Sequence, residues 1–387
     1  MSGNILIIYA KGTAEVYNRQ SALGSYIHCF ARILVKNGYS VKINGEEIGS
    51  ASVNNSATAG AKRVSSLRKF LPAFIKEYVK DRRLFKNMDA LFNRTDKTEF
   101  EQIVEFYTYG SDVGYRLSLK HDKKLVLLYD NPVLEEHSFF NPGQFFFRNR
   151  IEKMERQSIL RSSAIVVYSN AVKNYLQRKT GRTLPVYIHQ NVDYTRFDNI
   201  RAERPGATIN IGFIGSFLKW HNVDLLLSAF GKLKDAGWDI RLFLAGNGME
   251  FERISGLVKK NKYASFIEMP GFMDGDQLLE LKKKLHIGVM PGSNWYGAPN
   301  KIFEYGAAGM AVIAPDTPTI KGLFTDGNDL LLFRQDDETD MVNKLQVYLG
   351  DKELLKRYAL NLQEKIARQY SEKITFEFYN NILVGDR

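Results

Sequence analysis

The sequence predicts an α/β protein made of two Rossmann-like domains, each built on a doubly wound, mostly parallel sheet. Short apolar runs alternate with amphipathic helical patterns along the chain, as expected for sheets covered by helices on both faces. This alternation is interrupted around residues 200–208, IRAERPGAT. At 387 residues with 44% hydrophobic content, the chain is long enough to form two separate cores. We therefore predict an N-terminal domain over residues 1–203 and a second domain over 204–369.

The first domain begins with an apolar strand at 5–9, followed by a helix at 21–37 that ends at Lys-Asn-Gly. The small polar residues of 49–60 indicate a loop. The remaining predicted strands of this domain cover residues 39–43, 90–93, 103–108, 125–129, 164–168 and 186–189. This order of strands and helices is typical of a parallel sheet.

The second domain repeats the same rhythm. Its strands are predicted in INIGFIGS, IRLFLAGNG, SFIEMPG and HIGVMPG and in the apolar run that ends at Pro315, with amphipathic helices between them. After a helix at 353–369, the stretch KITFEFYNNIL predicts a last helix, within residues 370–387. The regular spacing predicts a doubly wound sheet.

The most informative segment is VMPGSNWYGAPNKIFEYGAAGMAVIAP, residues 289–315. A helix entered through a loop of small residues offers unpaired backbone N–H groups and the positive end of its dipole, which suits a diphosphate. Pro299 is placed to open this helix, and Lys301 in its first turn adds a positive charge. One turn later, Glu304 can accept hydrogen bonds from two adjacent sugar hydroxyls. The segment therefore predicts a nucleotide-sugar site.

This segment resembles the donor site of the family 4 glycosyltransferases of GT-B fold. Their signature has two Glu residues eight positions apart, and Glu304-Tyr305-Gly306-Ala307-Ala308-Gly309 matches its second half. A Pro-x-Lys-x-x-Glu-Tyr version of the helix, found in a subset of the family, fits residues 299–305. The resemblance implies that Glu304 binds the nucleotide ribose, but Tyr296 stands where the first Glu, associated with the transferred sugar, is expected. It also implies two domains that face a central cleft, with the last helix crossing back to the first.

Three glycine-containing loops extend the resemblance. The stretch after Ile214 is similar to the family's Gly-Arg-x-x-x-x-Lys-Gly diphosphate loop, although Ser216 and His221 occupy the Arg and Lys positions. Lys301, with Lys219, is expected to supply the charge that this loop lacks, while a purely structural turn is the alternative. The implied donor-binding residues in these loops are Gly215, Ser216, Lys219, His221, Gly246, Asn247, Gly248, Gly271 and Phe272.

Asp274-Gly275-Asp276 superficially matches the Asp-x-Asp metal motif of the other large glycosyltransferase fold. It stands directly before a helical pattern, where Asp274 as a helix N-cap explains it without a metal ion. We therefore expect no metal site and no cofactor beyond the nucleoside-diphosphate sugar, in keeping with the metal independence usual for GT-B enzymes.

Candidate acceptor-site residues follow the predicted strand at 125–129. Family members with the Trp-His variant of the glycine loop carry a Glu-Val-Asn-x-Pro-like stretch here. The carboxyl edge of a parallel sheet is where side chains reach a ligand, so a residue here can orient an acceptor hydroxyl and take its proton. The candidates are Asp130, Asn131, Glu135 and His137, and capping of the strand end is the alternative.

The positive charge of the chain is concentrated in its first half. The net charge is +11, and residues 1–203 carry 31 Lys and Arg against 20 Asp and Glu. Residues 62–86 alone hold nine basic and two acidic residues in an amphipathic pattern broken by Pro72. This segment is interpreted as a surface for anionic membranes, a site for a phosphorylated acceptor, or a core helix with a solvated basic face. We find no nucleic-acid recognition motif around it.

Other global features exclude several classes of protein. No apolar run approaches the roughly 18 to 20 residues needed to span a bilayer, and the N-terminus lacks a signal-peptide pattern. A single cysteine excludes an internal disulfide framework and a thiolate metal cluster. We expect a cytoplasmic protein that is soluble or peripherally bound to a membrane.

Together these features predict a glycosyltransferase that moves a sugar from a nucleoside-diphosphate sugar to a glycan or lipid-linked acceptor. The resemblance implies retention of the anomeric configuration. The alternatives are a GT-B nucleotide-sugar epimerase or sugar phosphorylase, and a noncatalytic binding subunit, which Tyr296 and the missing loop Arg favour. A Rossmann dehydrogenase fits less well, because no Gly-x-Gly-x-x-Gly follows the first strand.

Overall fold

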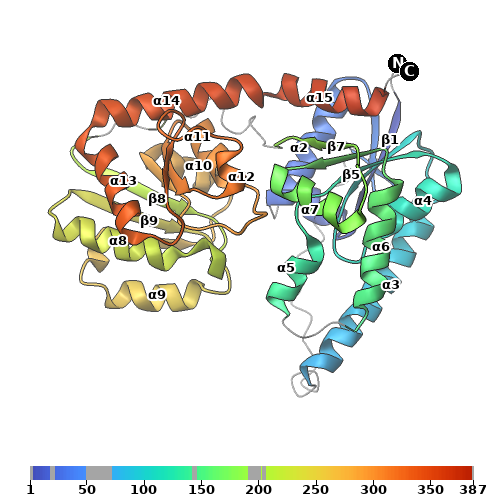
Figure 1. Ribbon diagram of the computed structural model, residues 1–387, viewed down its shortest axis with the longest axis horizontal. Coiled ribbons are helices and arrows are strands. Elements are labelled where there is room, and N and C mark those ends of the chain that lie inside the picture. Colours follow the sequence, from blue (N-terminus) through green and yellow to red (C-terminus); the bar gives the residue numbers. More distant parts are fainter. Residues whose placement is uncertain are drawn as a thin grey trace. The chain divides into compact units, whose positions relative to one another are not determined.

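The structure, a computed structural model, describes residues 3–17, 22–48, 72–141, 146–190, 202 and 206–385. The chain forms two compact units (Figure 1). Unit 1 contains Met1–Asn191 and Phe376–Arg387, and unit 2 contains Val192–Thr375. The first boundary between the units, after Asn191, thus lies before the predicted boundary at 203–204. The second boundary, after Thr375, lies beyond the predicted boundary at 369–370. Both folds follow the predicted α/β class.

Unit 1 is built on a seven-stranded sheet in the order β3-β2-β1-β4-β5-β6-β7. All its neighbouring strands are parallel except β3, which pairs antiparallel with β2. The strands are β1 (Asn4–Tyr9), β2 (Ser40–Ile43), β3 (Glu46–Glu47), β4 (Gln102–Phe106), β5 (Lys124–Leu128), β6 (Ala164–Val167) and β7 (Val186–Ile188). The chain order reverses between β1 and β4, so this sheet is doubly wound.

Helices flank this sheet. They are α1 (Thr13–Tyr17), α2 (Ala22–Lys36), α3 (Ala73–Thr95), α4 (Val113–His121), α5 (Val133–Phe140), α6 (Arg148–Arg161) and α7 (Asn170–Thr180). The predicted strand at 90–93 was wrong, because these residues lie inside α3. Phe85, Met88 and Leu91 recur at helical spacing and are all buried, and this longer pattern outweighs the short apolar run. Pro72, predicted to break the helix, is its N-cap.

The last helix, α15 (Glu372–Val384), packs on unit 1 from Phe376 onward. The Tyr379 ring lies edge-on to Phe30, with 4.6 Å between centroids, and its hydroxyl is 3.1 Å from that of Tyr26. Asn380 accepts a hydrogen bond of 2.7 Å from the Tyr39 hydroxyl. The C-terminal segment is therefore part of the core of unit 1.

Unit 2 contains a six-stranded, fully parallel sheet in the order β10-β9-β8-β11-β12-β13. Its strands are β8 (Ile209–Ile214), β9 (Ile240–Ala245), β10 (Ile267–Gly271), β11 (Ile287–Val289), β12 (Ala311–Pro315) and β13 (Leu331–Phe333). The chain order reverses between the neighbours β8 and β11. Ligands of doubly wound sheets bind beyond the carboxyl ends of the strands at such a reversal.

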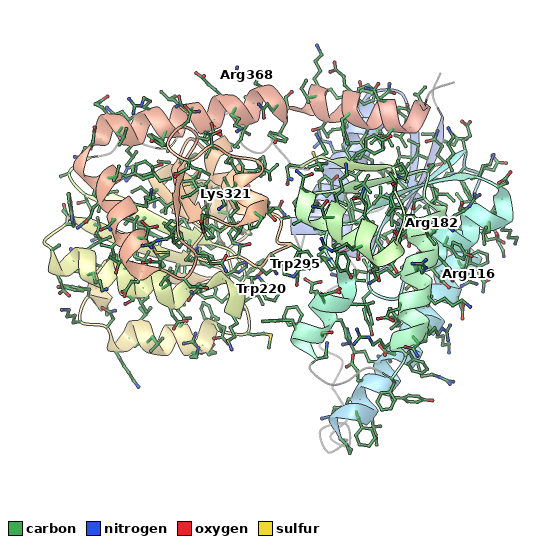
Figure 2. The ribbon with its side chains drawn as sticks, viewed as in Figure 1. Arg116, Arg182, Trp220, Trp295, Lys321 and Arg368 are labelled. Carbon is green, nitrogen blue, oxygen red and sulfur yellow. The ribbon has the colours of Figure 1, made fainter. Side chains whose placement is uncertain are left out.

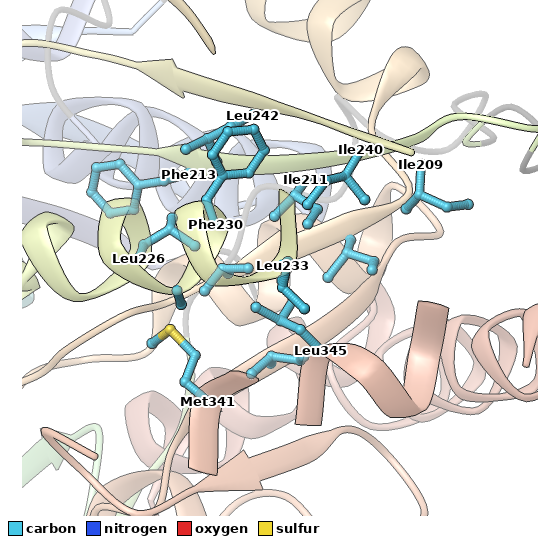
Figure 3. Packing of buried hydrophobic residues seen from close by; sticks show 14 of the residues in the cluster. Ile209, Ile211, Phe213, Leu226, Phe230, Leu233, Ile240, Leu242, Met341 and Leu345 are labelled. Carbon is cyan, nitrogen blue, oxygen red and sulfur yellow. The ribbon is translucent and has the colours of Figure 1, made fainter. Parts of the chain in front are cut away.

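The helical elements of unit 2 are η3 (Lys219–His221), α8 (Val223–Asp235), α9 (Phe251–Lys260), η4 (Ala264–Phe266), α10 (Gly275–Lys284), α11 (Asn300–Ala307), α12 (Pro318–Lys321), α13 (Glu338–Gly350) and α14 (Lys352–Gln369). Figure 3 shows the core on one face of the sheet, where Leu226 and Phe230 of α8 meet Phe213 of β8. Met341 and Leu345 of α13 complete this cluster. On the other face, α11 and α14 cover a second cluster that includes Phe303 and Leu362.

Candidate functional site

The candidate donor site lies where the chain order of the unit 2 sheet reverses. Residues 215–222 follow β8, residues 290–299 follow β11, and the second loop leads into the N-terminus of α11. The two loops touch, since a Cβ added to Gly292 would stand 2.6 Å from the carbonyl oxygen of Trp220. Figure 2 labels Trp220 and Trp295, one in each loop. Topology therefore brings the two most informative sequence motifs together.

The glycines of the first and second predicted loops pack backbone against backbone. A Cβ added to Gly246 would lie 2.0 Å from the carbonyl oxygen of Gly215, and one added to Gly248 would lie 2.6 Å from the amide nitrogen of Phe217. Gly246 has φ = 131° and Gly248 has φ = 153°, which adds a conformational reason for glycine at these positions. The amide of Phe217 also donates to the carbonyl of Asn247 at 2.9 Å. These glycines hold the loop after β8 in place.

Lys301 reaches back from α11 to the glycine loop. Its Cε would be only 2.3 Å from a Cβ added to Gly215, so the lysine stem uses the space that this glycine leaves. The ammonium group lies 5.7 Å from the centroid of the Phe213 ring. Burial lowers the pKa of Lys301 to about 8, against the opposing effect of the Glu304 charge. Among the described residues, no carboxylate forms an ion pair with this ammonium group.

His221 links the ammonium group of Lys301 to the loop backbone. Its Nδ1 lies within hydrogen-bond distance of the Ser216 carbonyl, and its Nε2 is 3.0 Å from Nζ of Lys301. A carbonyl can only accept, so Nδ1 carries the proton and Nε2 accepts from the ammonium group. Burial, followed by the Lys301 charge, lowers the pKa of His221 to about 3. The imidazole is therefore neutral, and the charge at this position belongs to Lys301.

Glu304 stands one turn further along α11, with about a third of its side chain exposed. Its Oε2 accepts a hydrogen bond of 2.7 Å from Nζ of Lys282, whose side chain is only 4% exposed. The sequence did not reveal Lys282, because Lys282–Lys284 at the end of a helix indicates a solvated run. The next residue, Tyr305, fixes the helix to the sheet by accepting from the amide of Ile214 at 2.7 Å.

Tyr296, at the position where the first Glu of the signature is expected, is buried with 7% exposure. Its amide donates to Oδ1 of Asn294 at 3.2 Å, and its ring lies edge-on to Trp295, 5.1 Å between centroids. The Trp295 carbonyl accepts from Oγ1 of Thr319 at 3.1 Å. Tyr296 thus belongs to the packing of its loop.

Lys219, also predicted to bind the donor, lines a different part of the surface from Lys301. Lys219 is exposed and lines a cleft of about 520 Å³ together with Asp224, Glu250 and Arg253. Arg253 is paired there with Asp224 at 2.6 Å and with Glu250 at 2.7 Å, so its charge is already balanced. Lys301 is not among the residues that line this cleft.

The predicted residues at the edge of the β9 and β10 ends are largely open to solvent. Phe272 is 71% exposed and Asn247 is exposed, while Gly271 has φ = 79° and ends β10. The Gly271 carbonyl accepts from the amide of Gly246 at 2.8 Å, so this turn supports the glycine loop. The structure joins these residues to the loop through backbone contacts.

The helix-cap interpretation of the Asp-Gly-Asp stretch is confirmed. Asp274 accepts from the amide of Gln277 at 2.9 Å, and the Gln277 side chain accepts from the amide of Asp274 at 3.0 Å. This capping box accounts for Asp274 at the start of α10. Over the described ranges, no group of three or more His, Cys, Asp or Glu side chains is arranged to hold a metal ion.

In unit 1, two of the four acceptor candidates share a polar cluster after β5. Tyr168 donates a hydrogen bond to Asp130, and Asn131 donates one to Glu136. Burial raises the pKa of Asp130 to about 6, and burial also raises the pKa of Glu136. Lys11, after β1, opposes both shifts by its charge. Glu136 and Lys11 were not predicted as site residues, and only the fold brings Lys11 to this cluster.

The other two acceptor candidates have partners that account for them structurally. Glu135 accepts a 2.7 Å hydrogen bond from the hydroxyl of Tyr175, which ties α5 to α7. His137 is buried, stacks on the Tyr109 ring at 3.9 Å between centroids, and places Nε2 3.1 Å from a carboxylate oxygen of Glu77 in α3. Burial lowers its pKa. The structure therefore does not bring these two side chains to the Asp130 cluster.

Comparison with known proteins agrees with this arrangement. Residues 197–365 match the family model of glycosyl transferases group 1, which covers the whole donor site described above. A Salmonella typhimurium protein named as a colanic acid biosynthesis glycosyltransferase, WcaL, is 21% identical over 188 residues. That match covers 47% of this chain and 46% of the relative, so it spans about half the length of each.

Similar solved structures cover the chain from end to end. Sucrose-phosphate synthase from Thermosynechococcus elongatus has a TM-score of 0.73 at 14% identity, with 99% of this chain and 100% of that chain covered. Anabaena Alr3699/HepE, solved with UDP and glucose, has a TM-score of 0.70 at 13% identity and the same coverage. A glycosyltransferase from Rickettsia africae has a TM-score of 0.65 at 15% identity, with both chains fully covered. The chain therefore has the GT-B fold, and its residues 197–365 are similar to the glycosyl transferases group 1 family.

Proposed function

We propose that this protein transfers a sugar from a nucleoside-diphosphate sugar to a glycan or lipid-linked acceptor. The observation that carries the proposal is the half-buried ammonium group of Lys301. It lies beside the glycine loop at the reversal of the sheet, and a neutral histidine hydrogen-bonds to it. A cation held by neutral groups at a helix N-terminus attracts an anion. A diphosphate leaving group develops negative charge as the glycosidic bond breaks, and this arrangement would stabilise it.

The roles of neighbouring residues follow from the same contacts. Glu304 would accept hydrogen bonds from ribose hydroxyls, with Lys282 holding its carboxylate in place. Asn300, in the first turn of α11, has a buried side-chain oxygen without a hydrogen-bond partner among the described residues, and a bound donor would satisfy it. Backbone N–H groups after Gly215 would complete the diphosphate site. No metal ion is required in this proposal.

In unit 1 we propose that Asp130, Asn131 and Glu136 orient the acceptor hydroxyl. A carboxyl group whose pKa is raised toward neutrality is suited to exchange a proton near pH 7. Retention of the anomeric configuration is part of the proposal only because the resemblance of residues 299–305 to the family 4 donor helix implies it. The cytoplasmic location stays a prediction.

The first test is nucleotide binding. A thermal-shift and calorimetric screen of UDP, GDP, ADP and their sugars should find one nucleotide that binds. Lys301→Ala should then weaken its binding by about 10- to 100-fold, since a hydrogen bond to a charged group contributes about 1.5–3 kcal/mol. Glu304→Ala should weaken it by a smaller factor. Lys259→Ala, an exposed lysine on α9, is the matched control and should bind as the parent chain does. Unchanged binding by both site variants would refute the donor site.

The second test separates the enzyme from its alternatives. A noncatalytic binding subunit is favoured by Tyr296, which puts a buried ring where a carboxylate is expected. Such a subunit would bind the nucleotide but release no nucleoside diphosphate from the sugar nucleotide. An epimerase would change the sugar with no acceptor present. Slow hydrolysis of the donor by the purified chain, with no epimer seen by NMR, would support the transferase.

A further inference from the structure

Exposed aromatic side chains gather at the start of α3 and just before α6. Phe74, Tyr78 and Phe146 have 52%, 40% and 50% of their surface exposed. The Phe146 ring lies 6.2 Å from that of Phe74 and 5.8 Å from that of Tyr78, centroid to centroid. They form one contiguous patch, and α3 carries it away from the sheet (Figure 1). A contiguous exposed apolar patch usually marks an interaction surface.

A core helix was one of the three interpretations of this segment, and the exposure of its first turns does not fit that interpretation. Phe85, Met88 and Leu91 supply the buried face of the helix, whereas Phe74 and Tyr78 do not reach that core. A large aromatic ring left half exposed forgoes part of the free energy that its burial would contribute. Three such rings together need an explanation other than the fold of unit 1.

The charges around these rings have one sign. Between Pro72 and Lys86 the basic side chains are all exposed, namely Lys76, Lys80, Arg82, Arg83 and Lys86. The two acidic residues of the same stretch face inward, with Glu77 at 5% and Asp81 at 1% exposure. Burial raises the pKa of Asp81 to about 6. The first turns of α3 therefore expose five basic side chains and no acidic one, although Lys80 also donates to the Glu77 carboxylate at 3.1 Å.

We propose that these eight residues, Phe74, Tyr78, Phe146, Lys76, Lys80, Arg82, Arg83 and Lys86, form a docking surface for an anionic lipid bilayer. We call it the aromatic–basic surface. Aromatic side chains favour the headgroup region, and basic side chains near an anionic leaflet are attracted to its charge. The surface thus combines the apolar and electrostatic signals that peripheral binding needs. A bilayer crossing is not part of the proposal, because none of the helices in the described ranges has the length and apolar character for it.

A nucleic acid is the competing partner for a basic face. Its phosphates would contact the basic side chains, and its bases would stack on aromatic rings whose faces are not already packed against other rings. Here Phe146 meets Tyr78 edge-on, and the other side of the patch stacks Tyr78 on Phe147 at 5.6 Å, so the rings engage one another. The docking surface does not depend on the proposed transfer reaction, although a lipid-linked acceptor would reside in the same bilayer. Of the predicted segment 62–86, residues 62–71 lie outside the described residues.

Vesicle flotation tests the proposal directly. The parent chain should float with phosphatidylcholine vesicles that contain 30% phosphatidylglycerol, and binding should fall about tenfold or more as NaCl rises from 0.1 to 0.5 M. It should not float with phosphatidylcholine alone. The triple variant Phe74→Ser, Tyr78→Ser, Phe146→Ser and the triple variant Lys76→Glu, Arg83→Glu, Lys86→Glu should each lose at least tenfold in binding. All six positions are exposed, so both variants should keep the parent's thermal unfolding.

Matched controls lie on unit 2. Lys259→Glu with Lys260→Glu changes charge on α9, and Leu360→Ser removes a residue that is 57% exposed on α14. Both controls should bind vesicles as the parent does. Equal binding to neutral vesicles, equal losses in the controls, or binding to an RNA oligomer but to no vesicle would overturn the proposal. Nucleoside diphosphate binding should be unchanged in every one of these variants, so failure here is distinct from failure of the donor site.

A fluorescence measurement reports the contact itself. The parent's Trp residues, Trp220, Trp238 and Trp295, all belong to unit 2. Phe146→Trp therefore adds a single emitter within the aromatic–basic surface. Brominated anionic lipids should quench this added emission and leave the parent's emission nearly unchanged. Absence of added quenching, while the protein floats with the vesicles, would place the contact elsewhere and refute the assignment.

Discussion

Nucleoside diphosphate affinity should fall between pH 7 and pH 9, because the charge of Lys301 is lost in that range. Burial, opposed in part by the charge of Glu304, lowers the pKa of this lysine from 10.5 to about 8. A lysine of that pKa is about nine-tenths charged at pH 7 and about one-tenth charged at pH 9. The diphosphate is already fully ionised above about pH 7.5, so its own titration adds little. Affinity that depends on the charged lysine should thus fall about tenfold per pH unit above 8.

Isothermal titration calorimetry at half-unit steps from pH 7 to 9.5 measures this decline. Lys301→Arg retains its charge throughout and should bind with no inflection in this range. Lys301→Met should bind weakly at every pH, and His221→Gln, which can still accept from Lys301, should retain the inflection. Proton uptake should accompany binding to the parent above pH 8, which two buffers of different ionisation enthalpy would reveal. A parent affinity that stays flat to pH 9.5 would refute the assignment of Lys301.

Three further predictions concern stability. Gly246→Ala should lower the free energy of unfolding by about 2–4 kcal/mol in urea, because its Cβ would overlap the Gly215 carbonyl at a positive φ; a loss under 0.5 kcal/mol would contradict the loop packing. Tyr305→Phe should lower the free energy of unfolding by about 1–3 kcal/mol, since it leaves the buried amide of Ile214 without an acceptor. Chemical denaturation measures this loss, and an unchanged free energy of unfolding would contradict it. Burial raises the pKa of Glu105 to about 7, so its contribution is fully present below about pH 4.5 and is lost as pH rises through 7. Between pH 4.5 and pH 8, the free energy of unfolding of Glu105→Gln should therefore rise by about 2–3 kcal/mol relative to that of the parent. Parallel curves of unfolding free energy against pH for the two proteins would show that the pKa of Glu105 is not raised.

The architecture was largely predictable because its signal is spread over many residues. Alternating strands and helices set the two parallel sheets, and five of the six observed strands in unit 2 lie at a predicted run. The sixth, β13, was not predicted. The wrong prediction of a strand at 90–93 has a local cause. Three apolar residues in a row fit a buried strand or one turn of a helix equally well, and only the spacing of Phe85, Met88 and Leu91 over a longer window separates them.

The donor site was partly predictable, since spacing within one loop or helix survives folding. The sequence suggested that Lys301 replaces the lost charge of the glycine loop, and the structure places its ammonium group beside Gly215 and His221. The partner of Glu304 was not predictable, because nothing in a run of three lysines distinguishes the buried Lys282 from its solvated neighbours.

The acceptor candidates show the opposite limit. Asp130 and His137 lie seven positions apart, yet Asp130 precedes α5 and contacts Tyr168, whereas His137 lies within α5 and contacts Glu77. Choosing candidates only because they follow the same strand therefore gave more residues than the structure brings together in one site. Lys11 was missed for the complementary reason, since β1 and β5 are separated in sequence and are brought near each other by the sheet order.

A crystal structure with the nucleoside diphosphate that binds best is the most direct test of the donor site. The account predicts phosphate oxygens within hydrogen-bond distance of Nζ of Lys301 and of the backbone after Gly215. It also predicts ribose hydroxyls on the carboxylate of Glu304. A nucleotide bound elsewhere on the chain, or one whose phosphates leave Lys301 hydrogen-bonded only to His221, would contradict it.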